Sequence, residues 1–133
     1  MAHDHPPVSI RLIAHNAAEC LDFYAKAFGA TEIMRWVDPD NGKIGHSEFV
    51  INGHHFSVAD GYKVMEDMGI KSPKLLGGTS AMIVLVVDDL EGAQARALEH
   101  GAQSLAPVED APGGGRRCRI GDPAGHVWIL AGD

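Results

Sequence analysis

Histidine and glutamate alternate along one short segment of the chain, Gly45-His46-Ser47-Glu48. In a β-strand, residues i and i+2 project from the same face, so His46 and Glu48 would lie side by side. Three kinds of chemistry suit such a pair: a hydrogen-bonded pair that lines a cavity, an acid–base pair, or half of a non-standard metal site. The residues alone leave all three open.

Neighbouring strands would add polar and aromatic side chains to the same cleft. His55 and Ser57 share one face of the strand that follows, whereas His54 points to the opposite face and cannot hold an ion jointly with His55. We expect His54 and the equivalent His126 to be solvated hairpin ends. Trp36 is a candidate ring for stacking on a ligand, whereas Phe56 and Trp128 are predicted to be core residues. The predicted ligand-binding residues are His46, Glu48, His55, Ser57, Trp36 and Cys118.

Cys118 is predicted to lie on the cleft face, close to Arg116, Arg117 and Arg119. Cations near a thiol lower its pKa, which would make Cys118 reactive; the alternative is a buried, inert thiol. Cys20 is the only other cysteine, and the two do not form a Cys-x-x-Cys pair. The sequence therefore predicts no disulfide framework.

These residues belong to an internal repeat with a constant offset of 72 positions. The matched pairs include Glu19 with Glu91, Gly29 with Gly101, Gly53-His54 with Gly125-His126, and Phe56 with Trp128. One ungapped register held over some fifty residues indicates a duplicated unit. The same register places Cys118 at the position of His46, and Ile129 at that of Ser57, so one half of the cleft would be polar and the other mostly apolar.

Each copy predicts one helix and four strands. The helices begin with the capping-box patterns Asn16-x-x-Glu19 and Asp88-x-x-Glu91, and end at Gly29 and Gly101. Short β-branched and apolar runs between turn residues predict the strands. Their ranges are 9–14, 32–37, 45–51, 54–59, 81–87, 103–108, 116–120 and 126–131.

These elements predict an α+β fold in which two tandem βαβββ units form curved mixed sheets around a cleft. The chain would be a single domain, with a first unit at 8–60, a linker at 61–80 and a second unit at 81–132. A sheet that buries one face against its helix leaves the other face free to line a cleft.

Composition narrows the classes of partner. The 133 residues carry a net charge of −7, which argues against nucleic acid and anionic membranes, and no apolar run reaches the ~20 residues of a membrane span. The first residues lack the basic and apolar regions of a signal peptide, so we expect a cytoplasmic protein.

Three motifs, in this order and spacing, resemble the vicinal oxygen chelate superfamily of glyoxalases, bleomycin resistance proteins and extradiol dioxygenases. They are Leu21-Asp22-Phe23-Tyr24 before Phe28-Gly29-Ala30, then Val87-Asp88-Asp89-Leu90, and finally Asp122-Pro123-Ala124-Gly125-His126-Val127-Trp128. Segments 44–49 and 72–79 are similar to the PhnB-like branch of this superfamily. The likeness covers nearly the whole chain.

The resemblance also suggests where a metal would bind. Its metal-dependent members use His or Glu at places that correspond here to Ser9 or Ile10, Ser57, Ala81 or Met82, and Ile129. None of these side chains is a good ligand for a divalent ion, so we expect no metal and no other cofactor.

The resemblance therefore implies a metal-free protein that binds or sequesters a small aromatic or amphipathic molecule, either a drug or a metabolite. The bleomycin-resistance members of the superfamily act in this way, which would give the protein a role in antibiotic resistance. It also implies a homodimer that completes the cleft. The alternative is an isomerase, lyase or dioxygenase with a non-standard metal site at His46, Glu48 and His55, or with a His46/Glu48 acid–base pair.

Overall fold

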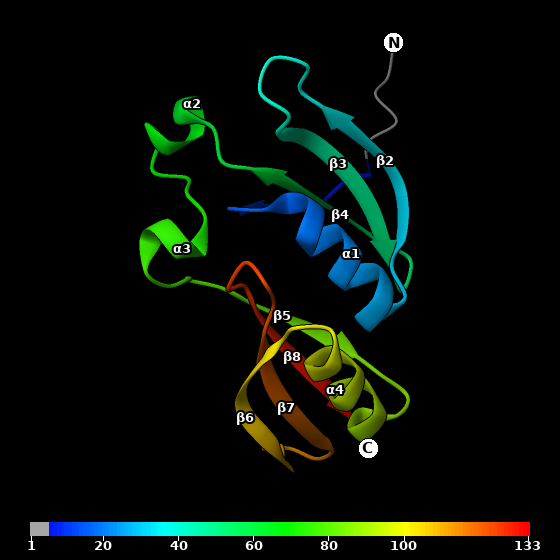
Figure 1. Cartoon of the computed structure of the whole chain (residues 1–133). Helices are drawn as coiled ribbons and strands as arrows, with labels where there is room; N and C mark the ends of the chain where they lie inside the picture. Colours follow the sequence, from blue (N-terminus) through cyan, green and yellow to red (C-terminus); the bar gives the residue numbers. More distant parts are fainter. Residues whose placement is uncertain (1–5) are drawn as a thin grey trace.

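The computed structural model describes residues 6–133, and it consists of two similar units joined by a connecting segment (Figure 1). The first unit contains β1 (Ile10–Ala14), α1 (Ala17–Phe28), β2 (Thr31–Val37), β3 (Ile44–Ile51) and β4 (His54–Asp60). The connecting segment carries two short helices, α2 (Lys63–Glu66) and α3 (Pro73–Leu76). The second unit contains β5 (Met82–Val86), α4 (Leu90–Glu99), β6 (Gln103–Asp110), β7 (Arg116–Gly121) and β8 (Val127–Gly132).

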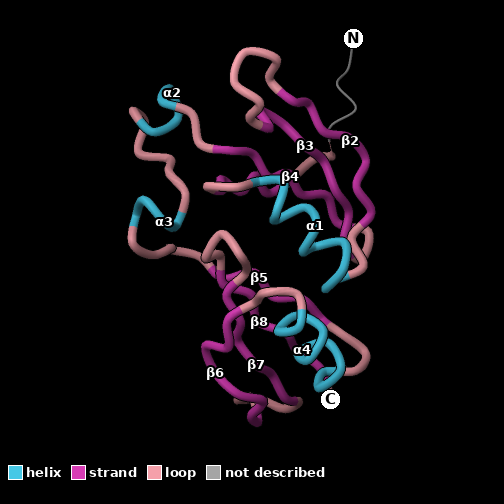
Figure 2. The backbone as a smooth tube through the Cα atoms, viewed as in Figure 1, coloured by secondary structure: helices cyan, strands magenta, loops and turns pink. Residues whose placement is uncertain are grey.

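The two sheets have the same topology. Their strand orders are β1-β4-β3-β2 and β5-β8-β7-β6, and in each the first pair is parallel while the others are antiparallel. Figure 2 shows one long helix beside each sheet, α1 in the first unit and α4 in the second. The predicted α+β fold with two βαβββ units and mixed sheets is confirmed.

The first helix begins and ends where the sequence predicts. Asn16 caps it by accepting a hydrogen bond from the backbone N–H of Glu19, and Gly29 ends it in the left-handed region at φ 69°. The second capping box is wrong by one residue, because Asp89 and not Asp88 caps α4, accepting from the N–H of Gly92.

An aromatic cluster fills the core between the two units. The Trp128 ring lies 4.8 Å from Phe28, 5.5 Å from Tyr24 and 5.8 Å from Phe56, centroid to centroid. Phe56 and Trp128, both predicted as core residues, are buried. Because one ring from the second unit contacts several from the first, the units share a hydrophobic core.

Buried polar bonds also tie the units together. The Tyr24 hydroxyl donates to Asp122 Oδ2 at 2.5 Å, and Trp128 Nε1 donates to the same oxygen at 3.0 Å. His126 Nε2 donates to the carbonyl of Ile13 at 2.9 Å. His126 was predicted to be a solvated hairpin end like His54; this is wrong, because its half-buried ring bridges the two units.

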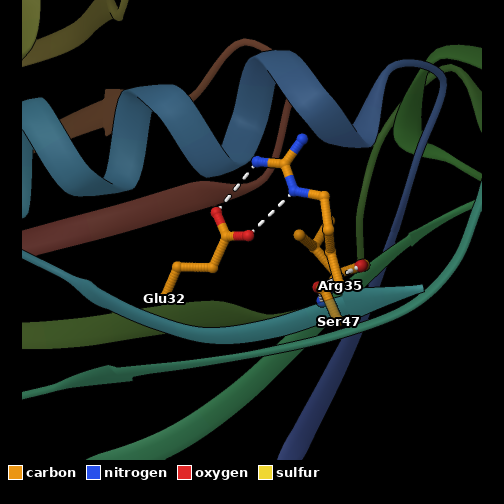
Figure 3. Close-up of polar contacts among 4 residues, drawn as sticks. Glu32, Arg35 and Ser47 are labelled. Carbon is orange, nitrogen blue, oxygen red and sulfur yellow. Dashed lines mark hydrogen bonds and ion pairs between the residues drawn. The ribbon is translucent and has the colours of Figure 1, made fainter. Parts of the chain in front are cut away.

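A bulge in β2 changes which of its side chains share a face. The register slips between Glu32 and Met34, so Glu32 and Arg35 both lie on the α1 side of the sheet, where Arg35 is opposite the buried Ser47. Figure 3 shows the two hydrogen bonds of 2.8 Å that join Glu32 and Arg35. The Arg35 guanidinium holds the pKa of Glu32 below its usual value. With Glu32 and Arg35 on this side, Met34 and Trp36 project to the opposite face.

Within residues 6–133, no helix has the length and apolarity needed to cross a bilayer.

Candidate ligand-binding face

The candidate site lies on the face of the first sheet that α1 leaves uncovered. Along β3, Ser47, Phe49 and Ile51 are buried towards the helix, whereas His46 and Glu48 are only partly buried and face away from it. The alternation predicted from the sequence is confirmed for this strand. We call this side of either sheet its open face.

His46 and Glu48 lie side by side on the open face. The distance from His46 Nε2 to Glu48 Oε2 is 4.0 Å, and their side chains are 28% and 30% exposed. This separation is too long for a direct hydrogen bond. Both groups are therefore able to turn towards a bound molecule.

Ser57 adds a buried hydroxyl to the same face. It is 6% exposed, and its Oγ makes no hydrogen bond among the described residues. The partner of Ser57 on the neighbouring strand β1 is Arg11, which is exposed. Because a buried polar atom without a partner costs free energy, Ser57 is a natural contact for a ligand or a water.

Trp36 is held against the open face by a glycine. Its partner on β3 is His46, and a Cβ at Gly45 would lie 2.6 Å from the Trp36 ring, closer than packed atoms come. The ring therefore lies against Gly45, close to Tyr62, and remains half exposed. Tyr62 is fixed in turn by a hydrogen bond from its hydroxyl to Asp38 Oδ2 at 3.0 Å.

Two hollows meet at this face. A small polar one of about 20 Å³ is lined by Ser9, Arg11, His46, Glu48, His55 and Ser57, together with Pro6 and Phe56. A larger cavity of about 580 Å³ opens between the β1/β4 edge of the first sheet and β5. Its lining is mostly apolar and includes Ile10, Ile51, Met82, Val84 and Trp128. Ser9, His55 and Phe56 line both hollows, so the polar hollow adjoins the apolar cavity.

The arrangement of two repeated βαβββ units agrees with a sequence comparison. The sequence model of the Glyoxalase/Bleomycin resistance protein/Dioxygenase superfamily matches residues 7–130. The chain belongs to this superfamily.

Proteins similar to this superfamily member match most of its length. An uncharacterised protein of Mycobacterium bovis is 38% identical over 125 residues, which are 94% of this chain and 82% of that protein. A glyoxalase-related enzyme from Fulvimarina pelagi has the same fold, with a TM-score of 0.73 and 22% identity over 97% of this chain and 89% of that one. The fosfomycin resistance protein FosX of Listeria monocytogenes also shares the fold, with a TM-score of 0.69 and 16% identity over 98% and 93% of the two chains.

The metal positions suggested by the superfamily resemblance do not fit a divalent ion here. At the positions where metal-dependent members have ligands, this chain has the Ser57 hydroxyl and aliphatic side chains such as Ile129. Ile129 pairs with another aliphatic residue, Val84. Across residues 6–133, no three His, Cys, Asp or Glu side chains are grouped so that they could hold an ion. His46 and Glu48 form a pair without a third donor of this kind.

The placement of Cys118 on the open face is wrong. Its side chain is fully buried on the α4 side of β7, where its partner is Leu130. Burial raises the pKa of the Cys118 thiol, as expected for the inert alternative and not for the reactive one.

A longer hairpin in the second unit explains the error. In the first unit Phe49 pairs with Phe56, seven positions on, whereas Ile120 pairs with Trp128, eight positions on. The ungapped offset therefore misplaces every residue of β7 by one, and a slip of one residue turns a side chain to the other face of a sheet.

Correct pairing reveals residues that the sequence prediction missed. The true counterparts of His46 and Glu48 in the second unit are Arg117 and Arg119, which flank the buried Cys118. Their alternation with Cys118 was visible in the sequence, but the extra hairpin residue was not. The open faces of the two sheets therefore carry different charges.

Proposed function

We propose that this superfamily member binds a small aromatic or amphipathic molecule, with the polar part at His46, Glu48 and Ser57 and the apolar part in the adjoining cavity. One observation carries the proposal: a polar hollow with an unsatisfied buried hydroxyl adjoins an apolar cavity of about 580 Å³. That volume is typical of pockets for drug-sized ligands. Sequestration of a drug or metabolite is the role we assign to it.

The binding test uses a neutral environment-sensitive dye, Nile red, and substitutions that fill the cavity. Met82 lines the cavity and is 56% exposed. We expect Met82→Trp to weaken dye binding at least about tenfold, the loss expected when about 1.4 kcal/mol of contact is removed. The matched control is Met68→Trp in the connecting segment, at a site that is 62% exposed and does not line the cavity. Equal affinities of the two variants for the dye would contradict the proposal.

The polar half is tested by Ser57→Ala. Removal of the hydroxyl relieves an unsatisfied buried group, so we expect a slightly more stable protein that binds polar aromatic ligands more weakly. Thermal unfolding with and without a screen of small aromatic compounds measures both effects. A variant that keeps wild-type ligand shifts would exclude Ser57 from the site.

An enzyme is the second candidate, favoured by the 4.0 Å approach of His46 and Glu48 on an accessible face. A positioned acid–base pair of this kind can accelerate a reaction ~10²–10⁴-fold. Mass spectrometry of any ligand that binds, before and after long incubation, tests this candidate. Turnover that disappears in both His46→Ala and Glu48→Gln would establish the enzyme, and an unchanged ligand would leave binding as the function.

We also propose that the protein forms a homodimer. Met82, Val84 and Val86 alternate along β5 and are all more than half exposed on the open face. Contiguous exposed apolar surface on a small protein is typical of an interaction site, and because the same three residues line the cavity, a second copy would close its open side. Sedimentation velocity should give a dimer that Val84→Asp converts to a monomer, with Val64→Asp in the connecting segment as the control. A wild-type monomer at tens of micromolar would refute the proposal.

A further inference from the structure

The open face of the second sheet carries two arginines that the proposed function does not yet use. Arg117 and Arg119 alternate with the buried Cys118 along β7, so both guanidinium groups lie on the side away from α4. The Nε atoms of both are shielded from solvent and have no hydrogen-bond partner among the described residues. Shielded guanidinium donors without acceptors are costly unless something else supplies the acceptors.

The neighbouring Arg116 shows what a satisfied arginine looks like on the same strand. Arg116 points to the other side of β7, where it pairs with Glu91 of α4 and also donates to the carbonyl of Asp133 at 2.7 Å. No ion pair among residues 6–133 involves Arg117 or Arg119. The contrast separates a structural arginine from two that are available to a ligand.

The two arginines differ in what lies across the sheet from them. Glu109 of β6 is opposite Arg117 and offers it partial charge compensation. Arg119 lies between Ala106 on β6 and Ile129 on β8, both apolar. We call the residues that pair with one another across the strands a row. Arg119 has no carboxylate beside it in its own row, and it is therefore the stronger candidate for contact with an anion.

The row that contains Arg119 leads to the proposed ligand cavity. Ile129 pairs with Arg119 on one side and with Val84 of β5 on the other, and Val84 lines the large cavity. Adjacent strands are about 4.8 Å apart, so β5 and β7 are separated by roughly 10 Å. A molecule with an apolar body of this length would cover Val84 and Ile129 and reach Arg119 with its polar end.

From this row we infer that the ligand is an anion: a carboxylate, phosphate or phosphonate on an apolar body, held by Arg119 with support from Arg117. This inference rests on the proposed function and adds to it a second, anionic group of the ligand, separate from the polar part held at His46, Glu48 and Ser57. Arginine presents a planar fork of donors that matches all three anions. The protein's net charge of −7 disfavours the approach of an anion overall, and the two arginines on this face offset that effect locally.

Isothermal titration of the wild-type protein with matched probes tests the inference. The probes are 4-phenylbutyrate, 4-phenylbutylphosphonate and the neutral 4-phenyl-1-butanol, which share one apolar body. We expect both acids to bind about 10- to 100-fold more tightly than the alcohol, the range for a charge-assisted contact. The ratio between the two acids then identifies which anion the site prefers.

Variants of the arginines identify which side chain causes the preference for the acids. Arg119→Gln should abolish the preference for the acids, so that acid and alcohol bind equally, and Arg117→Gln should reduce it less. Arg116→Gln removes the same charge from the same strand and should leave the preference within about twofold of wild type, since its guanidinium is committed to Glu91. Circular dichroism confirms folding of each variant, and a shift of the Arg119 Nε–Hε resonance on adding phenylbutyrate gives an independent readout.

The outcomes separate this inference from the proposed function. Equal binding of acid and alcohol to the wild type, or an acid preference that survives in Arg119→Gln, overturns the inference and leaves apolar ligand binding intact. If none of the three probes binds saturably and Nile red does not bind either, both the inference and the proposed function are overturned.

Discussion

The bond between Tyr24 and Asp122 should make a large contribution to stability, and Tyr24→Phe isolates it. The substitution removes only the hydroxyl that donates to Asp122 Oδ2 at 2.5 Å. The ring can keep its stacked contact with Phe49, at 4.9 Å between centroids. Asp122 is buried, and its Oδ2 would keep a single donor, Trp128 Nε1.

The expected loss follows from that geometry. A hydrogen bond to a charged group contributes about 1.5–3 kcal/mol, and the lost donor leaves the buried Asp122 carboxylate less well solvated. For a domain of this size, that loss lowers the melting temperature by roughly 5–11 °C. Since Tyr24 and Asp122 come from different units, the whole cooperative transition should shift.

Urea unfolding followed by circular dichroism measures the effect, with Tyr62→Phe as the control. The Tyr62 hydroxyl also donates to a carboxylate, Asp38 Oδ2, but in a more exposed position. We expect the control to lose clearly less stability than Tyr24→Phe, because its hydroxyl is not buried. If Tyr24→Phe cost no more than the control, the interpretation of Asp122 as the buried link between the units would be refuted.

Three further predictions concern two buried thiols, the close contact between Gly45 and Trp36, and the buried hydroxyl of Tyr24. Native protein should react with a thiol reagent such as Ellman's reagent only as fast as unfolding exposes its cysteines, because both thiols are buried and burial raises the pKa of Cys20 and of Cys118. Rapid labelling of either cysteine in the folded protein would contradict this prediction. Gly45→Ala should displace the Trp36 ring, change its fluorescence and cost about 1–3 kcal/mol, since the new Cβ would lie 2.6 Å from a ring carbon; an unchanged emission spectrum would place the ring elsewhere. Stability should fall as the pH rises above about 9, because burial also raises the pKa of Tyr24 above its usual 10.0 and the folded state then holds a proton that the unfolded state releases. Above about pH 10, the fall in stability with pH should be shallower in Tyr24→Phe than in the wild type. Equal slopes of stability against pH in the two proteins would contradict this prediction.

Local signals were sufficient to predict most of the fold. Turn and cap residues such as Asn16 and Gly29 act through their own backbone geometry, so their effect is visible in the sequence. Strand alternation likewise placed His46 and Glu48 on the open face, because the period of two is a property of any strand. These predictions needed no knowledge of distant contacts.

The errors arose where distant segments decide the outcome. Cys118 was placed on the wrong face because strand pairing, and not the repeat, sets the register of β7. Asp89 caps α4 in place of Asp88, a shift of one residue that propensity does not resolve. His126 was assigned to solvent, since no local signal shows that Ile13 lies next to it.

The sequence by itself therefore determined the two repeated units, both ends of the first helix, most strands and the polar character of the first open face, because each depends on residues close together in the chain. Only the tertiary structure decided the link from Tyr24 to Asp122, the junction of the polar hollow with the apolar cavity, and the position of Arg119 on the open face with its Nε unsatisfied. The physical reason is that strand register and the packing of one unit on the other are set by contacts between residues far apart in sequence. A single extra residue in the second hairpin therefore turns every side chain of β7 to the face opposite to the one that the repeat predicts.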